Sequence, residues 1–303
     1  MASECYPSYR KILSSGGFDD IITRADRKLA ACDLCPRRCG VDRTAGELGF
    51  CKVGESLRVS SYGPHYGEES PLVGKHGSGT IFLAGCNLGC CFCQNYDISN
   101  QGEGRDVSAE DVSMMMLKLQ ETGCHNINFV TPTHFVPQII RAVMIAAARG
   151  LSVPIVYNCG GYEEVGTLKL LENIVDIYMP DLKFSNPASS GKYCDAPDYP
   201  DFARTAVKEM HAQTGDLVVK NGLAHRGLLV RHLVMPGMLE ESKQIFKFLA
   251  TEISPETFVN VMNQYRPCYN AGRFPEIAGR LDRGEFRAVL DAAWEAGLKR
   301  IYY

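Results

Sequence analysis

The chain has 303 residues and a formal net charge of −3 at pH 7, and its residues are 45% hydrophobic and 22% charged. This composition excludes wholesale disorder, and a chain of this length buries a core large enough to fold without disulfides. The weak net charge does not indicate nucleic acid or an anionic membrane surface as a partner.

Residues 1–30 form the first predicted element, a weakly determined helical region with a break at residues 14–17. They carry charges throughout and lack the apolar core of a signal peptide. No later stretch approaches the roughly 18 apolar residues that a membrane-spanning helix needs. We therefore expect a cytoplasmic protein without a membrane partner, in which thiols stay reduced.

The cysteine content is the anomaly of this composition. The chain contains 13 cysteines, an odd number that cannot pair completely. In a reducing compartment such residues act as metal ligands, catalytic groups or small core residues. Seven fall into two groups, which are Cys32, Cys35, Cys39 and Cys51, followed by Cys86, Cys90 and Cys93. The other six are scattered: Cys5, Cys91, Cys124, Cys159, Cys194 and Cys268.

The first group lies in an N-terminal extension, residues 1–76, with the spacing C-x2-C-x3-C-x11-C over residues 32–51. Four thiolates can close a tetrahedral site and suit zinc or an iron–sulfur cluster about equally well. Arg37 and Arg38 beside them would offset the negative charge of such a site. We expect a structural metal here, zinc or an auxiliary cluster, and the alternative is four free thiols in a substrate-binding lobe.

The second group has the spacing C-x3-C-x2-C and closely follows the apolar run at residues 81–84. Three thiolates are one short of a closed zinc site and one short of a fully ligated four-iron cluster. Either metal would therefore keep one open position for a small molecule. Cys91 is an awkward fourth ligand because its side chain diverges from that of its neighbour Cys90. The alternative is a loop of core cysteines.

From about residue 77 onward, predicted strands alternate with predicted helices, which favours βα units and a parallel sheet. Ser108 and Asp111 match a helix N-terminal cap, and the residues that follow repeat apolar side chains at helical spacing. The predicted strands are 80–84, 126–130, 154–157, 174–179, 228–234 and 257–261. The predicted helices are 109–119, 136–149, 164–172, 201–213, 239–251 and 284–296.

Six βα units predict an α/β fold, a partial (β/α)6 TIM-like barrel over residues 77–303, with the Cys-rich extension in front of it. In α/β barrels the chemistry lies at the carboxyl ends of the strands. A candidate motif follows every predicted strand. In order, these motifs are at residues 86–93, 131–134, 158–160, 181–183, 235–237 and 263–268.

The motifs also carry a resemblance to a known family. The segments GSGTIFLAGCNLGCCFCQNYDIS, NINFVTPTH, IVYNCGGYE, DIYMPDLKF, VRHLVMPG and NQYRPCYNA occur in this order, and Phe92 precedes the last cysteine of the second group. Over residues 30–303 the sequence resembles the radical S-adenosylmethionine (SAM) superfamily, in particular proteins related to pyruvate formate-lyase-activating enzyme.

The resemblance implies a [4Fe-4S] cluster on Cys86, Cys90 and Cys93, with Phe92 beside the cofactor. One iron without a protein ligand would chelate SAM, and an electron from the cluster would cleave it to methionine and a 5′-deoxyadenosyl radical. The radical would take hydrogen from a substrate. The implied partners are a low-potential donor such as flavodoxin or ferredoxin, and a glycyl-radical enzyme or peptide. An open cluster is oxygen-sensitive, so we expect an anaerobic or microaerobic host.

Further site residues are expected at the strand ends. Lys183 suits the methionine carboxylate of SAM and Asp181 a ribose hydroxyl or a cation, although a solvated ion pair is the alternative. The resemblance also implies an alkali-metal cation held by Asn158, Asp181 and two backbone carbonyls, those of Cys159 and Met179. Here Asn158 stands where relatives often carry Asp, which removes one ligand charge.

Three other strand-end positions are candidates. The second strand lacks the G-G-E-P motif of most family members, so the hydroxyls of Thr131 or Thr133, or backbone carbonyls, would replace it. Arg231 and His232 point to opposite faces of the fifth strand. We assign Arg231 to SAM or an anionic substrate and His232 to structure. Cys268, in the polar segment after the sixth strand, is a candidate catalytic hydrogen donor or a residue without special function.

Three functions follow from this sequence. The first is an activase that places a radical on a glycine of a protein partner. The second is a stand-alone radical SAM catalyst that acts on a peptide or small molecule. The third is a non-catalytic zinc or iron–sulfur module.

Overall fold

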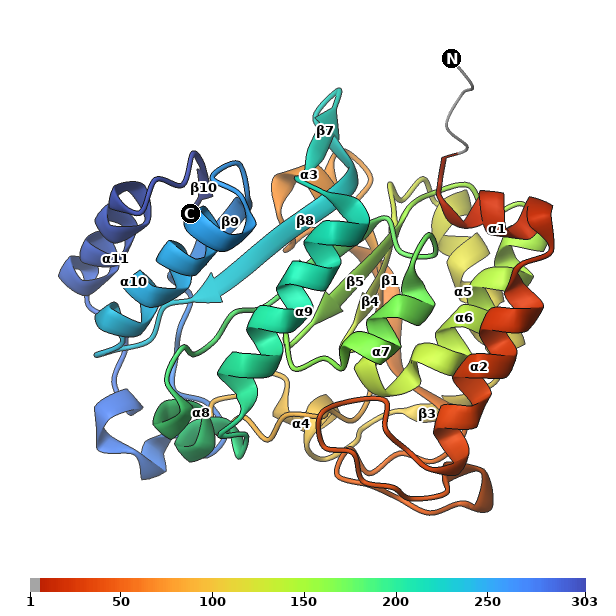
Figure 1. Cartoon of the computed structure of the whole chain (residues 1–303), viewed down its shortest axis with the longest axis horizontal. Coiled ribbons are helices and arrows are strands. Elements are labelled where there is room, and N and C mark those ends of the chain that lie inside the picture. The colour runs from red at the N-terminus through yellow and green to blue at the C-terminus, as the bar shows by residue number, and fades with distance from the viewer. Residues whose placement is uncertain (1–5) are drawn as a thin grey trace.

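The computed structural model describes residues 6–303, so Cys5 lies outside the described residues. Its strands join one sheet in the order β10-β9-β8-β6-β5-β4-β2-β1-β3, with β7 paired to β8 (Figure 1). The strands are β1 Leu57–His65, β2 Ser78–Leu83, β3 Arg105–Val107, β4 Ile127–Val130, β5 Ile155–Cys159, β6 Ile177–Pro180, β7 Val218–Lys220, β8 Leu223–Leu233, β9 Phe258–Met262 and β10 Arg300–Tyr302.

The centre of the sheet is parallel from β2 through β4, β5, β6, β8 and β9 to β10. Strands β4, β5 and β6 are short, mostly buried apolar runs, as expected for strands that are covered on both faces. Ile127, Phe129 and Ile155 are fully buried, for example. At the other edge β1 pairs antiparallel with both β2 and β3. Within residues 6–303 the two edge strands, β3 and β10, do not pair, so the curved sheet is open.

The longer helices cover the outside of this sheet, where α2 and α5 both pack against α6, and α10 packs against α11 (Figure 1). The predicted cap of α5 is confirmed, since Ser108 and Asp111 form a reciprocal capping box. The helices are α1 Tyr9–Ser15, α2 Phe18–Ala30, α3 Ser70–Val73, α4 Tyr96–Ser99, α5 Ala109–Glu121, α6 Val136–Ala148, α7 Val165–Leu168, α8 Pro187–Cys194, α9 Tyr199–Thr214, α10 Leu239–Phe248 and α11 Arg283–Glu295.

The α/β class and all six predicted strands are confirmed, with boundaries that differ by up to five residues. The sequence interpretation missed the short strands β3, β7 and β10, helix α8, and the antiparallel pairing of β1. Strand β1 lies in the N-terminal extension and pairs with β2, so the extension contributes directly to the sheet. Helix α10 is shorter than predicted because it ends in a π-helical turn at Leu249–Ile253.

The loops that follow the parallel strands gather at one end of the sheet, the lower edge in Figure 1. In this view α8, α4 and the loop of residues 31–53 lie below the arrowheads of β5 and β8, from left to right. All six motifs singled out in the sequence lie at this end. In the described part of the chain, no helix is both long and apolar enough to cross a membrane.

Candidate active site at the carboxyl ends of the strands

The loop after β2 brings the thiols of Cys86, Cys90 and Cys93 together. Cys90 is buried and the other two are partly buried. Burial raises the pKa of Cys86 and of Cys93, and the nearby charge of Cys90 raises both further. The Leu88 backbone N–H donates to the Cys86 sulfur at 3.3 Å. Three soft sulfur donors on one shielded loop therefore fit an iron–sulfur cluster in their chemistry.

A fourth thiol, which the sequence interpretation left without a role, touches this group. Cys194, the last residue of α8, places its sulfur 3.1 Å from that of Cys90 and donates to it. Two backbone hydrogen bonds fix this contact, because the N–H groups of Gly89 and Cys91 donate to the carbonyls of Cys194 and Tyr193. The hydrogen bond from Cys194 lowers the pKa of Cys90, which favours the thiolate that a metal ion needs. Only tertiary packing reveals this neighbour, since 104 residues separate the two cysteines.

Lys183 and Asp181, which follow β6, form a shielded ion pair beside the cysteine loop. The Lys183 Nζ lies 2.6 Å from Asp181 Oδ2, and the two side chains are only 14% and 15% exposed. Burial alone would lower the pKa of Lys183, but the charges of Asp181 and Cys90 raise it. The alternative of a solvated surface pair is therefore wrong. A retained ammonium at this place can bind an anionic group next to the thiols.

Arg231 of β8 extends the ion pair into a network. Its Nε donates to Asp181 Oδ1 at 2.8 Å and its Nη2 donates to Asn158 Oδ1 at 2.7 Å. Its Nη1 lies 3.5 Å from Glu68 Oε2. Burial would raise the pKa of Asp181, but Arg231 and Lys183 lower it, so the carboxyl stays ionised. Arg231 thus orients Asp181, and it is not a free binding group for an anion.

His232, the neighbour of Arg231, is structural as expected. Its Nδ1 and Nε2 lie 2.7 Å from the Leu182 carbonyl and 2.8 Å from the Ser242 hydroxyl. Burial lowers its pKa to about 4, so the ring is neutral near pH 7.

The backbone around Asp181 and Lys183 is held by Tyr199 of α9. Its hydroxyl accepts the Lys183 N–H at 3.0 Å and lies 2.8 Å from the Asp181 carbonyl and 3.0 Å from that of Gly160, to one of which it donates. Gly161 makes this close approach of two strand ends feasible. It has φ of 79°, and a Cβ there would lie 2.3 Å from the Asp181 carbonyl oxygen. The second glycine of N-C-G-G is thus explained by geometry.

At the end of β4 the two candidate threonines differ. Thr131 is partly exposed and adopts φ of 60°, which turns the chain at this point. Thr133 is fully buried and its hydroxyl donates to Glu163 Oε1 at 2.7 Å. This geometry argues against a ligand contact from Thr133 and leaves Thr131 and nearby carbonyls for that role.

Glu163 is a buried carboxyl that the sequence interpretation missed, although it belongs to the quoted N-C-G-G-Y-E motif. It is fully buried, and the Tyr157 hydroxyl donates to its Oε2 at 2.9 Å. Burial raises its pKa to about 7, while hydrogen bonds from Thr133, Tyr157 and Cys159 act in the opposite direction. Glu163 therefore ties the end of β4 to the end of β5.

Phe92 belongs to the cysteine loop, whereas Cys268 lies in another segment that touches the loop. Phe92 is 4% exposed and its ring packs edge-on against Phe184, with centroids 6.1 Å apart. Cys268 is partly exposed in the segment after β9. That segment touches the cysteine loop, because the Asn270 N–H donates to the Cys91 carbonyl at 2.8 Å. The segment that carries Cys268 is therefore attached to the loop that carries the three thiols.

The four cysteines of the extension are also neighbours of one another. Burial is the main cause that raises the pKa of Cys35 to about 12, and the charges of Cys51 and Cys32 contribute. Burial raises the pKa of Cys51 as well, with contributions from Cys32 and Cys39. Over the described residues, however, no three His, Cys, Asp or Glu side chains converge on one position suited to a single metal ion.

The two arginines that we expect to offset the charge of these thiols also make other contacts. Arg37 donates to the Asn87 carbonyl at 3.0 Å and packs its guanidinium 3.7 Å from the centre of the Phe50 ring. Arg38 pairs with Glu164 at 3.0 Å. The charge of Arg43, a fully buried residue, instead lowers the pKa of Cys51. Arg37 thus fastens the four-cysteine segment to the loop after β2.

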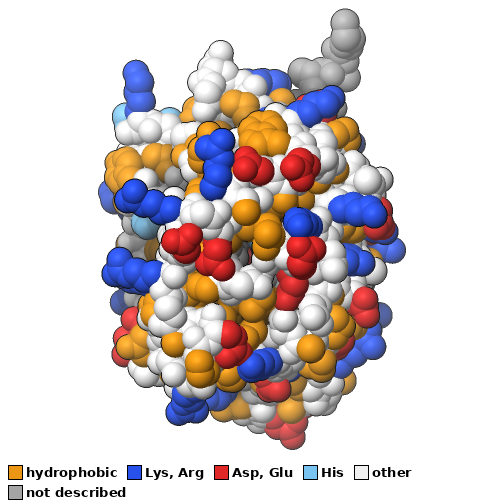
Figure 2. All heavy atoms as spheres, turned by 90° about the vertical axis from the view of Figure 1, so that its left-hand side faces the viewer, with side chains coloured by type: hydrophobic (Ala, Val, Ile, Leu, Met, Phe, Trp, Pro, Cys, Tyr) orange, Lys and Arg blue, Asp and Glu red, His pale blue; other side chains and the backbone are white. Residues whose placement is uncertain are grey.

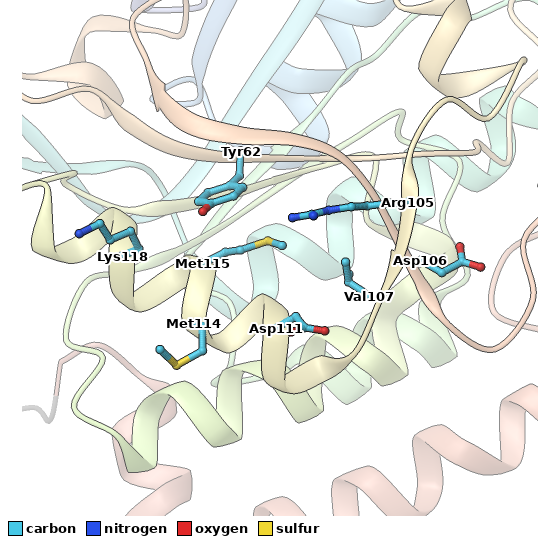
Figure 3. A pocket seen from close by; sticks show the side chains of 8 residues that line it. All are labelled: Tyr62, Arg105, Asp106, Val107, Asp111, Met114, Met115 and Lys118. Carbon is cyan, nitrogen blue, oxygen red and sulfur yellow. The ribbon is translucent and has the colours of Figure 1, made fainter.

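The molecule also has a groove away from these strand ends, of about 430 Å³, between β1, β3 and α5 (Figure 3). Tyr62, Arg105 and Met115 are among the side chains that line it. The chemistry-bearing residues described above do not contribute to it. Figure 2 shows the molecule from the left-hand side of Figure 1, and on this face acidic, basic and hydrophobic side chains are interspersed.

Comparison with known proteins gives matches over most of the chain. The model of the radical SAM superfamily matches residues 80–249. The uncharacterised protein MJ0674 of Methanocaldococcus jannaschii is 32% identical over 280 residues, which cover 89% of this chain and 76% of that protein. A second protein of that organism, MJ0808, is 25% identical over 299 residues, covering 92% and 82%.

Two solved structures are more distant. Streptococcus suis SuiB bound to S-adenosylmethionine has a TM-score of 0.48 and 12% identity, and covers 69% of this chain. This chain spans only 44% of the SuiB chain. Methylornithine synthase (PylB) has a TM-score of 0.47 and 13% identity, covering 99% of this chain and 83% of that chain.

Proposed function

Because this chain belongs to the radical SAM superfamily, we propose that Cys86, Cys90 and Cys93 hold a [4Fe-4S] cluster and that the chain is a SAM-cleaving enzyme. When bound and reduced, the cluster supplies the electron that splits SAM into methionine and a 5′-deoxyadenosyl radical, which abstracts hydrogen from a substrate. The electron donor in this proposal is a low-potential protein such as flavodoxin or ferredoxin.

One observation carries the proposal. The three thiols and the Lys183–Asp181 pair, which come from loops about 90 residues apart, lie at the same end of the sheet, close enough for the Lys183 charge to lower the pKa of each thiol. SAM carries a carboxylate close to its amino group. A sulfur-rich metal site next to a shielded ammonium suits SAM, because the ammonium can bind this carboxylate.

The chain's own residues bind and orient the cofactor in this proposal. Lys183 binds the carboxylate of SAM, and Asp181 holds the Lys183 ammonium in place. Thr131 and the backbone at the end of β4 face the amino group, where Thr131 turns the chain with φ of 60°. Cys194 donates a hydrogen bond to Cys90, and the buried rings around Phe92 keep water from the back of the loop.

We propose a protein or peptide as the substrate, in an activase-like reaction on a glycyl-radical enzyme. The support is an exposed aromatic pair beside the cysteine loop. Tyr96 of α4 stacks on Tyr269, with ring centroids 5.1 Å apart and exposed fractions of 36% and 45%. Exposed tyrosines are typical of protein-recognition surfaces. The polar, exposed Asn263 and Gln264 after β9 favour the second candidate, a stand-alone catalyst that acts on a small molecule.

The substrate is tested after anaerobic reconstitution and reduction. An activase gives about one radical per partner chain, seen as a glycyl doublet by electron paramagnetic resonance. Tyr269→Ala should weaken this doublet, while SAM cleavage without the partner stays unchanged. Multiple turnovers with a free small molecule would instead establish the second candidate. An intact reduced cluster that never cleaves SAM would leave only a non-catalytic module.

The four-cysteine segment is a second metal site in this proposal. Its support is that Cys32 and Cys51 lie close enough to raise the pKa of Cys35, and that Cys32 and Cys39 lie close enough to raise the pKa of Cys51. Iron and zinc analysis of the wild type and of a variant lacking Cys86, Cys90 and Cys93 distinguishes the metals. Iron retained by the variant indicates an auxiliary cluster, and zinc indicates a structural site. If the variant holds neither metal, the four cysteines are free thiols.

A further inference from the structure

The side-chain oxygens expected to hold an alkali-metal cation already accept hydrogen bonds from this chain's own cations. The expected side-chain ligands are Asn158 and Asp181, and one oxygen of each accepts a hydrogen bond from Arg231, at 2.7 Å and 2.8 Å. The second oxygen of Asp181 accepts from Lys183 at 2.6 Å. The donor set therefore does not fit an additional cation.

The Arg231 guanidinium is held firmly in this position. Its Cα lies opposite that of Asn260 in the neighbouring strand β9, and its backbone carbonyl accepts the Leu182 N–H at 2.8 Å. Its third nitrogen lies 3.5 Å from Glu68, whose side chain is 7% exposed. A guanidinium is planar, always charged and able to bind two acceptors at once, as it does here.

A second cation at the same oxygens would be unfavourable. It would lie next to the guanidinium, where like charges repel strongly because little water screens them. It would also compete for Asp181, the carboxylate that both Arg231 and Lys183 use. Asn158, with no charge of its own, adds little attraction for a metal ion, whereas its amide oxygen is a suitable acceptor for an N–H donor.

We propose that Arg231 replaces the alkali-metal cation of this site. Its guanidinium is a built-in cation that orients Asp181 and Asn158 and adds positive charge near the carboxylate of SAM. SAM binding in this chain is then independent of K⁺ and Na⁺. Arg231 is a positioning residue in this inference, which rests on the proposed SAM site but not on the identity of the substrate.

The test compares SAM affinity in K⁺, Na⁺ and choline chloride at equal ionic strength, measured by calorimetry on the reconstituted protein. We expect the dissociation constants of the wild type to agree within about twofold. Arg231→Met, which keeps most of the side-chain volume but removes the charge, frees one oxygen each of Asp181 and Asn158. SAM binding by this variant should be tighter in K⁺ or Na⁺ than in choline by about tenfold or more.

Arg226→Met is the matched control, since it removes an arginine of the same strand whose Nη1 contacts Ser8 outside the site. It should show no cation dependence. A wild-type affinity that falls by about tenfold in choline would overturn the inference. So would an Arg231→Met variant that binds SAM equally in all three salts.

A second readout separates this inference from the proposed function. Thermal unfolding of the reconstituted full chain, measured without SAM, does not depend on SAM binding. Its midpoint should be the same in K⁺, Na⁺ and choline for the wild type and should rise with K⁺ or Na⁺ only in Arg231→Met. If Arg231→Met does not fold, Arg231→Gln takes its place. A wild-type unfolding midpoint that depends on the cation contradicts the inference without any variant. A reconstituted protein that never binds SAM counts against the proposed function, while this readout still decides the role of Arg231.

Discussion

The sulfur of Cys194 lies 3.1 Å from the sulfur of Cys90 and donates a hydrogen bond to it. The contact joins the end of α8 to the loop that we propose as the cluster site, and two backbone hydrogen bonds hold it. Hydrogen bonds to cluster sulfurs raise reduction potentials, because they stabilise the more negative reduced state.

We therefore expect Cys194→Ala to retain the cluster and lower its reduction potential by some tens of millivolts, a change of order 1 kcal/mol for one electron. Redox titration followed by electron paramagnetic resonance measures it. Cys124→Ala is the matched control, a buried cysteine whose thiol contacts Thr122 and the His76 carbonyl. An unchanged or higher potential in Cys194→Ala would show that the thiol does not donate to the cluster.

Lys183→Met should weaken SAM binding by about ten- to a hundredfold without loss of iron. The reason is that the shielded ammonium of Lys183 is the proposed partner of the SAM carboxylate, while the cluster ligands are unchanged. Calorimetric titration with SAM and iron analysis on the same sample check both parts. Lys208→Met serves as the control, because its partner Glu252 lies on the surface. Equal SAM affinity in Lys183→Met and Lys208→Met would refute the assignment.

Gly161→Ala should cost about 1 to 3 kcal/mol of unfolding free energy and also weaken SAM binding. Its φ is 79°, and the new Cβ would lie 2.3 Å from the Asp181 carbonyl oxygen, so the end of β6 must shift. Urea unfolding measures the loss. Gly166→Ala in α7, where a Cβ would meet nothing within 4 Å, should be neutral or stabilising. If the two variants are equally stable, the close approach of the two strand ends is not as described.

Asp176, which lies outside the site, should make the stability of the fold depend on pH. It is fully buried and accepts hydrogen bonds from the Ser8 N–H at 2.9 Å and the Ile155 N–H at 3.1 Å. Burial raises its pKa from 3.8 to about 6. Because the folded value is the higher one, its contribution is fully present below about pH 4 and is lost as the pH rises through about 6.

Asp176→Asn removes this titration. Relative to that variant, the wild type should lose roughly 2 to 3 kcal/mol of unfolding free energy between pH 4 and pH 7. Urea unfolding at both pH values measures the difference, and the exposed Asp291→Asn should follow the wild type. A constant difference between wild type and Asp176→Asn across this range would contradict the raised pKa.

The sequence was sufficient for β2, β4, β5, β6, β8 and β9, since each contains an apolar run and is followed by a candidate motif. It was also sufficient for the location of Cys86, Cys90, Cys93, Asp181 and Lys183 at one end of the sheet. Strand β10 was missed because three residues, Arg300–Tyr302, carry too little periodicity, and within residues 6–303 it pairs with β9 alone.

The partners of the site residues could not be predicted, because they depend on tertiary packing. Cys194 is one scattered cysteine in the sequence and reaches Cys90 only when α8 packs on the loop after β2. The engagement of Thr133 by Glu163, and of Asn158 by Arg231, likewise joins different strand ends. Spacing along the chain identifies which residue types can form a site. The hydrogen-bond partners of these residues are set by the tertiary structure.

The most direct test of the central claim is SAM cleavage by the reconstituted, reduced protein in the absence of oxygen. The wild type should convert SAM to methionine and 5′-deoxyadenosine, and replacing Cys86, Cys90 or Cys93 by Ala should abolish both products together with the cluster. A wild-type protein that holds a reduced [4Fe-4S] cluster and binds SAM, but forms neither product, would contradict the account.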